Sequence, residues 1–208
     1  VDIIIGTHAL LSDKVKFKNL GLLIVDEEQR FGVKQKEKLK EIGAGIHVIT
    51  LSATPIPRTL HMSMTGIRDL SLITTPPVDR LNINTYVMNF DEIVLREAIN
   101  RELNRDGKVI IVVPRISDIP QIELKLSNTL KNIEYCVAHG QMSGVALDNI
   151  INDFYDGKFK VLIATTIVES GLDIPKANTI IIYKADRFGL SQLHQLRGRV
   201  GRGKERAY

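Results

Sequence analysis

Seven short runs of apolar, mostly β-branched residues recur along the chain, and longer mixed stretches separate several of them. Runs of this kind are typical of strands buried on both faces of a parallel sheet. They lie at residues 2–5, 22–25, 47–51, 109–113, 133–137, 161–164 and 179–183. The stretches between them predict helices at residues 34–42, 91–103, 117–130 and 143–155. The alternation of strand and helix predicts an α/β fold with right-handed crossovers.

Two further local signals refine this pattern. Asp91 stands directly before the predicted helix 91–103 and is a predicted N-cap. The Pro-Pro pair in TTPPVDR (74–80) fits neither a helix interior nor a central strand, so it predicts a domain boundary. We therefore expect a first lobe over residues 1–75, a linker over 76–84 and a second lobe over 85–208.

Composition places the chain among ordinary globular proteins, with 44% hydrophobic and 25% charged residues. No apolar run approaches the roughly 18 residues that a membrane span requires, so we expect no membrane partner. Cys136 is the only cysteine, which rules out an internal disulfide and a multi-cysteine metal site. A cytoplasmic location fits these features.

The positive charge is concentrated at one end of the chain. Residues 184–208 carry seven basic and two acidic residues, while the other residues sum to a net charge of −1. This excess of basic residues indicates binding to phosphate, either of a nucleotide or of a nucleic acid, with a merely solvated charged end as the alternative.

Three consecutive acids, Asp26, Glu27 and Glu28, follow the predicted strand 22–25. Ligands of open α/β sheets bind at the carboxyl ends of the strands. There an aspartate can hold Mg²⁺, and the next acid can orient a water for attack on a γ-phosphate. The alternative is that these acids only stabilise a helix N-terminus.

Small hydroxyl residues and glycine-spaced arginines follow other predicted strands. Ser52 and Thr54, just after strand 47–51, are able to hydrogen-bond to the acids. Near the end of the chain, Arg199 and Arg202 stand three positions apart in QLRGRVGR, on a predicted helix that places both on one face. An arginine offered to a γ-phosphate neutralises charge in the transition state, whereas a nonspecific basic patch is the alternative for this stretch alone.

Four motifs in the order DEEQ, SAT, ESGLDIP and QLRGRVGR resemble those of the superfamily 2 helicases and translocases. The longer stretches GTHALL, TLSATPIPRTLHMSMTGIRDLSLI and ADRFGLSQLHQLRGRVGRG are similar to the bacterial transcription-repair coupling factors, the Mfd proteins. The alternative is a fork-remodelling helicase of the RecG type, which is expected to show an acid-Gln-His order where this chain has Glu28, Gln29 and Arg30.

The resemblance implies two RecA-like lobes with mainly parallel sheets and ATP between them, the first lobe being truncated at its N-terminus. Asp26 would hold Mg²⁺ and Glu27 would polarise the attacking water. The further residues implied to bind ATP are Gln195, Gly171 and Asp173, with Arg199 and Arg202 as catalytic arginines. Those implied to couple hydrolysis to motion are Ser52, Thr54 and Glu169.

The same resemblance implies double-stranded DNA as the track of the motor. The DNA-binding residues it implies are Gly6, Thr7, His8, Thr165 and Thr166. His139 is either a turn-stabilising residue or a further DNA contact. Because aromatic residues make up only 5% of the chain, we expect it to bind the DNA backbone without sequence preference.

The chain departs from the family pattern in one respect: it contains no G-x-x-x-x-G-K-[ST] phosphate-binding loop. We therefore expect a fragment of a motor core that is inactive as an ATPase by itself and acts at most as a nucleic-acid-binding module without catalysis. In the parent protein, the implied activity is displacement of stalled RNA polymerase and recruitment of nucleotide excision repair, through regions outside this chain. We also expect the first lobe to be less stable than the second.

Overall fold

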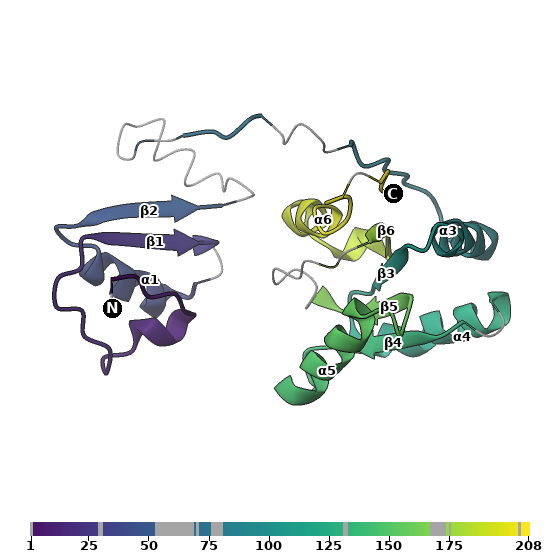
Figure 1. Cartoon of the computed structure of the whole chain (residues 1–208), viewed down its shortest axis with the longest axis horizontal. Coiled ribbons are helices and arrows are strands. Elements are labelled where there is room, and N and C mark those ends of the chain that lie inside the picture. Colours follow the sequence, from purple (N-terminus) through teal and green to yellow (C-terminus); the bar gives the residue numbers. More distant parts are fainter. Residues whose placement is uncertain are drawn as a thin grey trace. The chain divides into compact units, whose positions relative to one another are not determined.

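The computed structural model describes residues 2–28, 31–52, 69, 71–75, 81–130, 133–166, 174, 176–203 and 205–208. It divides into two compact units, Val1–Leu72 and Ile73–Tyr208. Figure 1 shows a small unit with β1, β2 and α1 and a larger unit with the remaining labelled elements. Residues 83 and 84 pack within the larger unit, because Ile83 contacts its core and the Asn84 N–H donates to the Ala207 carbonyl at 2.9 Å.

The smaller unit is built on one pair of parallel strands. Strands β1 (Leu22–Asp26) and β2 (His47–Leu51) pair in register from Leu22↔His47 to Asp26↔Leu51. Helix α1 (Val33–Ile42) joins them, and the short 3-10 helix η1 (His8–Leu11) precedes them. The strands predicted at 22–25 and 47–51 and the helix predicted at 34–42 are confirmed.

The strand predicted at residues 2–5 is wrong. These residues belong to no strand, and the side chains of Ile3 and Ile5 are 80% and 93% exposed. An apolar run becomes a strand only when a neighbouring strand pairs with its backbone. In the described part of this unit, the sheet consists of β1 and β2 alone.

The larger unit contains a four-stranded parallel sheet in the order β4-β5-β3-β6. Its strands are β3 (Lys108–Val112), β4 (Tyr135–Ala138), β5 (Val161–Ala164) and β6 (Ala177–Ile182). They match the four apolar runs predicted in this part of the sequence, with ends that differ slightly. The mainly parallel α/β prediction is therefore confirmed.

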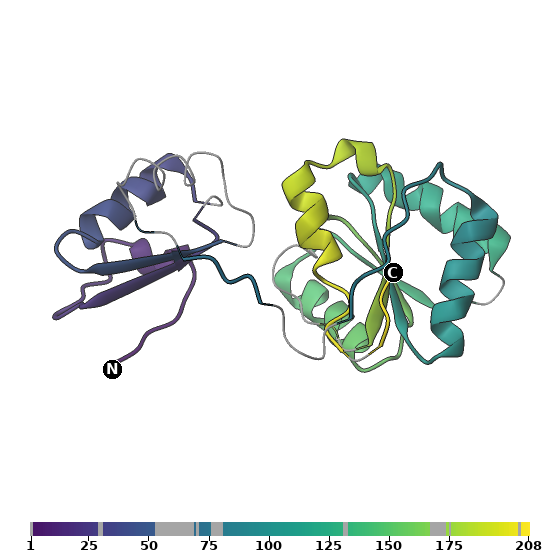
Figure 2. The ribbon, with the colours of Figure 1, turned by 90° about the horizontal axis from the view of Figure 1, so that it is seen from above.

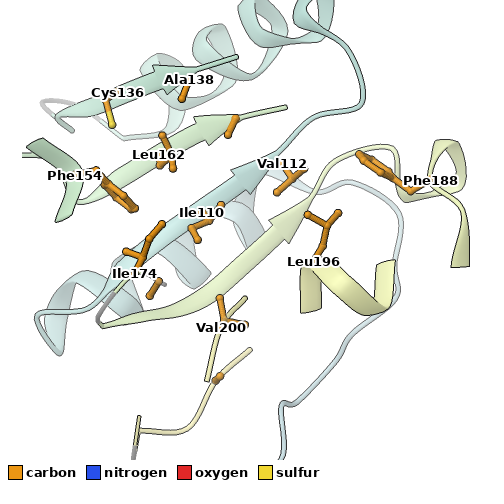
Figure 3. Packing of buried hydrophobic residues seen from close by; sticks show 13 residues of the cluster. Ile110, Val112, Cys136, Ala138, Phe154, Leu162, Ile174, Phe188, Leu196 and Val200 are labelled. Atoms are coloured by element: carbon orange, nitrogen blue, oxygen red, sulfur yellow. The ribbon is translucent and has the colours of Figure 1, made fainter. Parts of the chain in front are cut away.

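Helices cover both faces of this sheet, because successive strand residues point to opposite sides. Ile110 and Val112 pack with Phe154 and Leu196 on one face, whereas Val109 and Ile111 face the opposite cluster. Figure 2 shows helices on the two sides of the sheet, and Figure 3 shows the first cluster from close by. The helices are α3 (Glu92–Asn104) and α4 (Ile119–Thr129) on one face, and α5 (Gly144–Tyr155) and α6 (Leu190–Arg197) on the other.

The helix ends follow their sequence signals. The Asp91 carboxylate accepts hydrogen bonds from the N–H groups of Ile93 and Val94 at 2.7 and 3.3 Å, which confirms the predicted N-cap of α3. Ser143 caps α5 in the same way, by accepting from the Ala146 N–H at 3.3 Å. Local side-chain chemistry therefore sets where these helices begin.

The amino edge of the larger sheet carries a lysine-rich cluster around Asp106. Its carboxylate accepts hydrogen bonds from Lys160 and Lys176, each at 2.6 Å, and its backbone is left-handed with φ of 56°. The lysine hydrogen bonds lower the pKa of Asp106 from 3.8 to about 2. This edge is opposite the one where the chain places its predicted binding residues.

Replacing Asp106 by Asn is expected to remove a pH-dependent part of stability. Because the folded pKa lies below the unfolded one, the ionised group stabilises the fold above about pH 4, and this stabilisation is lost as the pH falls towards 2. Urea unfolding at pH 6 and pH 2 measures it: the wild type is more stable than D106N at pH 6, and the difference shrinks at pH 2. A difference of equal size at both pH values would contradict the ion-pair origin.

The two units differ in how much apolar surface they bury. Among the described residues of the smaller unit, only Val25 belongs to the buried core, while Leu22, Ile24 and Val48 are 48%, 57% and 44% exposed. The larger unit contains the two fully formed clusters described above. Apolar burial is the main stabilising term in folding, so the smaller unit has little of it.

We predict that backbone amides of β1 and β2 exchange with solvent at least ~10²-fold faster than those of β3 and β5, because local opening is easier where few apolar contacts are broken. Hydrogen exchange read by mass spectrometry on the monomeric chain checks this. Equal protection of the two units in a verified monomer would show that the smaller unit is stabilised by contacts other than its own core.

Candidate functional site

The acids of the smaller unit lie at the carboxyl end of its two strands. Asp26 is the last residue of β1 and pairs in register with Leu51, the last residue of β2. The Glu27 N–H donates to the Leu51 carbonyl at 3.0 Å, so the ladder continues one step past β1. Ser52 follows Leu51 directly. The pairing therefore brings Asp26, Glu27 and Ser52 to one edge of the sheet, as the sequence predicted.

Glu27 has a backbone conformation that side chains with a Cβ rarely adopt. Its φ is 53°, in the left-handed region, which costs about 1 kcal/mol or more for a residue other than glycine. The hydrogen bond of its N–H to Leu51 holds the backbone in this turn. Strain of this kind occurs often at functional sites.

A carboxylate at this edge has the chemistry to bind a magnesium ion, although no three metal-ligating side chains come together in the described part of the chain. Mg²⁺ prefers oxygen ligands and usually binds through one or two carboxylates together with substrate phosphates. Asp26 is exposed at the strand end, and Glu27 and Glu28 are only partly buried, so the three carboxylates are accessible to solvent. Asp26 is the residue for which we retain the predicted role of metal ligand.

The predicted DNA-binding residues of the smaller unit lie before its sheet. Gly6, Thr7 and His8 are all exposed. Thr7 is the N-cap of η1, and its hydroxyl accepts from the Ala9 N–H at 3.4 Å. These residues are thus available to a ligand, and their DNA contact remains a prediction.

In the larger unit, the residues after the strands meet at the carboxyl edge. Thr165 follows β5, and its N–H donates to the carbonyl of Ala138, the last residue of β4, at 3.3 Å. His139 follows Ala138 directly, so the pairing of β4 with β5 brings the backbone of His139 close to that of Thr165 and Thr166. Thr165 is 8% exposed, while Thr166 is half-buried.

His139 combines features of both roles left open by the sequence. Its carbonyl accepts from the Met142 N–H at 3.1 Å, which closes a turn before α5. Its ring Nδ1 is buried without a hydrogen-bond partner in the described structure. The turn is therefore observed through its backbone, and the DNA contact remains a prediction.

The expected helical placement of the two catalytic arginines is wrong. Helix α6 ends at Arg197, with Gly198 as its C-cap, so Arg199 and Arg202 lie beyond the helix. The chain then turns through Gly201, whose φ is 69°. Arg199 is half-buried and Arg202 is exposed. Glycines that end and turn the chain, rather than a helix face, set the positions of these side chains.

The remaining predicted nucleotide-binding and coupling residues divide into two groups. Gln195 lies on α6 and is half-buried, next to the fully buried Leu196 of the core. The other four lie outside the described residues, and their roles remain predictions: Thr54, Glu169, Gly171 and Asp173.

An ion pair at the carboxyl edge of β6 did not come from sequence reasoning. The Lys184 ammonium donates to Asp118 at 2.5 Å and to Gln121 at 3.2 Å, and Lys184 is left-handed with φ of 52°. Asp118 is 6% exposed. The contact was not predicted, because the two residues lie far apart in the sequence and Lys184 counted only as one of the basic residues near the end of the chain.

In the part of the chain that the structure describes, no helix has the length and apolar character needed to cross a membrane.

Two family profiles match this arrangement of elements. That of the helicase conserved C-terminal domain matches residues 91–204. The chain belongs to the helicase conserved C-terminal domain family. A second profile, that of the DEAD/DEAH box helicases, matches residues 1–63, so each unit of this helicase chain is matched by a helicase profile.

The curated relatives confirm the resemblance to coupling factors. Over all 208 residues, the helicase chain is 58% identical to the transcription-repair-coupling factor of Rickettsia bellii and 53% identical to that of Escherichia coli. The corresponding protein of Bacillus subtilis is 53% identical over the same length. The chain spans 19%, 18% and 18% of these three proteins, about a fifth of their length.

Solved helicase structures confirm the RecA-like fold. A structure of RecG bound to a three-way DNA junction superposes with a TM-score of 0.72 at 38% identity, covering 98% of this chain and 27% of RecG. Saccharomyces cerevisiae Dbp5, bound to RNA and ADP BeF3, gives a TM-score of 0.69 at 19% identity, covering 96% of this chain and 55% of Dbp5. The second likeness concerns the fold alone.

Proposed function

We propose that this chain is part of an ATP-driven translocase on double-stranded DNA that displaces stalled RNA polymerase and couples transcription to nucleotide excision repair. The identity of 53% to 58% over the whole chain to proteins named transcription-repair-coupling factor carries this proposal. RNA polymerase and the excision-repair proteins bind through parts of the parent protein outside this chain. Its place of action is the cytoplasm.

The acids of the smaller unit carry the hydrolytic chemistry of the proposal. Asp26, exposed at the end of β1, holds Mg²⁺ through its carboxylate. The bound ion supplies positive charge that neutralises the triphosphate. Glu27 accepts a hydrogen bond from the attacking water and orients it towards the γ-phosphate. The left-handed backbone of Glu27, directly after the last residue of β1, supports a role distinct from that of Asp26.

The arginines of the larger unit complete the nucleotide site in this proposal. Arg199 and Arg202 donate to the phosphoryl group as its negative charge redistributes, with Gln195, Gly171 and Asp173 as further ATP contacts. The exposed position of Arg202 after a glycine-containing turn supports its reach towards a ligand.

Coupling and DNA binding use the neighbouring strand ends. Ser52 lies beside the acids at the carboxyl end of β2, and it couples hydrolysis to motion together with Thr54 and Glu169. Thr165 and Thr166 contact the DNA backbone from the larger unit, and Gly6, Thr7 and His8 contact it from the smaller one. The accessible positions of Gly6, Thr7 and His8 support this assignment.

Two alternatives remain separable from this proposal. A RecG-type fork-remodelling helicase is supported by the 38% identity to RecG, which is lower than that to the coupling factors. For the isolated chain, a nucleic-acid-binding module without catalysis is supported by its lack of a phosphate-binding loop motif.

Replacing Glu27 by Gln in the intact protein is expected to lower DNA-stimulated ATP turnover by ~10²–10⁴-fold, because the base that orients the water is removed. Nucleotide binding, measured with a fluorescent ATP analogue, stays near wild type because Asp26 is unchanged. Glu37→Gln is the matched control, since it makes the same change at an exposed position on α1. Normal turnover by E27Q would remove Glu27 from its role.

Binding of the 208-residue chain to a 25-bp DNA duplex is expected to weaken steeply with salt. If about four lysine or arginine side chains contact phosphates, the affinity falls ~10²-fold between 50 and 200 mM salt, because counterions are released on binding. Fluorescence anisotropy with two duplexes of unrelated sequence measures both the slope and the lack of sequence preference. Salt-insensitive binding, or a strong preference for one duplex, would contradict backbone recognition.

A further inference from the structure

A fully buried carboxylate stands at the centre of a polar network in the larger unit. Glu102, in the last turn of α3, is 0% exposed. Its carboxylate accepts hydrogen bonds from the Thr179 hydroxyl at 2.5 Å and from the Asn178 amide at 3.4 Å, and it forms an ion pair with Arg105. A buried charge is stable only when it is paired and hydrogen-bonded, and this one is both.

The chain leaves space for this carboxylate at Gly107. A Cβ added at Gly107 would overlap the Glu102 carboxylate, so any other residue there would displace that carboxylate. The Gly107 N–H also donates to the Glu102 carbonyl at 2.9 Å, which fixes the turn between α3 and β3. The glycine therefore leaves room for the Glu102 carboxylate in the position where Thr179 and Asn178 bind it.

Arg105 extends the network to the residues at the end of the chain. Its Nη1 donates to the Arg206 carbonyl at 2.7 Å, while its other terminal nitrogen pairs with Glu102. The guanidinium carbon of Arg105 is also 5.5 Å from the centre of the Tyr208 ring, within the range of a cation–π contact. A single side chain thus ties α3 to residues 206 and 208.

Residues 206–208 lie along the free edge of β6. The Tyr208 N–H donates to the Asn178 carbonyl at 2.8 Å, and the Tyr208 carbonyl accepts from the Ile180 N–H at 2.9 Å. This is the hydrogen-bond pattern of a parallel pair, with Tyr208 opposite Thr179. Thr179 therefore binds Glu102 through its hydroxyl, while the backbone groups of the residues on either side of Thr179 bind Tyr208.

Residues 206–208 are in direct contact with residues 199–202, the turn that carries Arg199 and Arg202. Ala207 is 0% exposed, and a Cβ added at Gly201 would lie 2.8 Å from the Ala207 Cβ. Val200, also 0% exposed, belongs to the same core cluster as Ala207. Since Gly201 lies between Arg199 and Arg202, Ala207 limits how closely the backbone that carries both arginines can approach residues 206–208.

We propose that Glu102 and Arg105 are positioning residues for the arginine turn, residues 199–202. Glu102 orients Arg105, and Arg105 donates to the carbonyl of Arg206. Residues 206–208 then pack against Gly201 through Ala207. This inference rests on the proposed function, in which Arg199 and Arg202 act on the phosphoryl group. The contacts that carry it lie in α3, in β6 and in the end of the chain, outside the four motifs.

The test uses the intact translocase that contains this chain. Arg105→Met removes the guanidinium, and Arg96→Met is the matched control, because Arg96 is an exposed arginine on α3, the helix that Arg105 follows directly. We expect R105M to lower the kcat of DNA-stimulated ATP hydrolysis at least ~5-fold with KM for ATP unchanged, because misplaced arginines lose a contact made in the transition state. We also expect the amides of residues 199–203 to exchange ~10-fold faster, with exchange in β3 and β5 unchanged.

A second pair of variants tests the network from its other end. Thr179→Val removes the hydroxyl that binds Glu102 without changing the side-chain shape, and Thr179→Ser keeps it. T179V is expected to show the same loss of kcat as R105M, and T179S is expected to keep the wild-type kcat. This pair decides the matter if R105M lowers the melting temperature enough to unfold the larger unit.

The outcomes separate the inference from the proposed function. If E27Q abolishes turnover while folded R105M and T179V keep wild-type kcat and exchange, the positioning role is overturned and the proposed function stands. If turnover is lost only together with the fold in both R105M and T179V, the network is merely structural and the inference is likewise overturned. If E27Q itself keeps normal turnover, the proposed function fails first.

Discussion

Parallel pairing of strands is the constraint on which the other features of this chain depend. In a parallel ladder, each strand ends at the same edge, so residues far apart in sequence meet where the strands stop. In the smaller unit, the ladder from Leu22↔His47 to Asp26↔Leu51 places two acids beside Ser52. In the larger unit, the same geometry places Thr165 beside the end of β4.

The two edges of the larger sheet carry different kinds of contact. The amino edge contains the Asp106 ion pairs with Lys160 and Lys176, which stabilise the turns that lead into the strands. The carboxyl edge carries the residues proposed to bind DNA. Between them, apolar clusters on both faces hold the strands in register, with Ile110 and Ile111 on opposite sides. The carboxyl edge also holds a stabilising contact, the Lys184–Asp118 ion pair, so both kinds of group occur there.

Most of the fold could be predicted because its signals are local. Strands buried on both faces require continuous apolar runs, and Asp91 marks the start of the helix that it caps. The strand prediction for residues 2–5 was wrong, because the apolar character of a run does not supply a partner strand. The prediction that Arg199 and Arg202 lie on one helix face was also wrong. Gly198 ends the helix before Arg199, and a spacing of three residues places side chains on one face only within a helix.

The site could be predicted only as far as strand order brings residues together. Asp26, Glu27 and Ser52 follow from the ends of neighbouring strands, but the left-handed turn at Glu27 has no sequence signal of its own. The network of Glu102 was hidden for another reason. A glutamate near the end of an amphipathic helix resembles a surface residue, and its partners lie more than 70 positions away at Asn178 and Thr179.

The central proposal is that, in the intact protein, the acids of the smaller unit and the arginines of the larger unit act on one bound triphosphate. A structure of the intact protein with Mg²⁺ and a non-hydrolysable ATP analogue tests it most directly. The account predicts Asp26 at the metal, Glu27 at a water in line with the γ-phosphate, and the guanidinium of Arg199 or Arg202 in hydrogen-bond contact with that phosphate. Acids and arginines that bind separate ligands, or that face different surfaces of the nucleotide-bound protein, would contradict it.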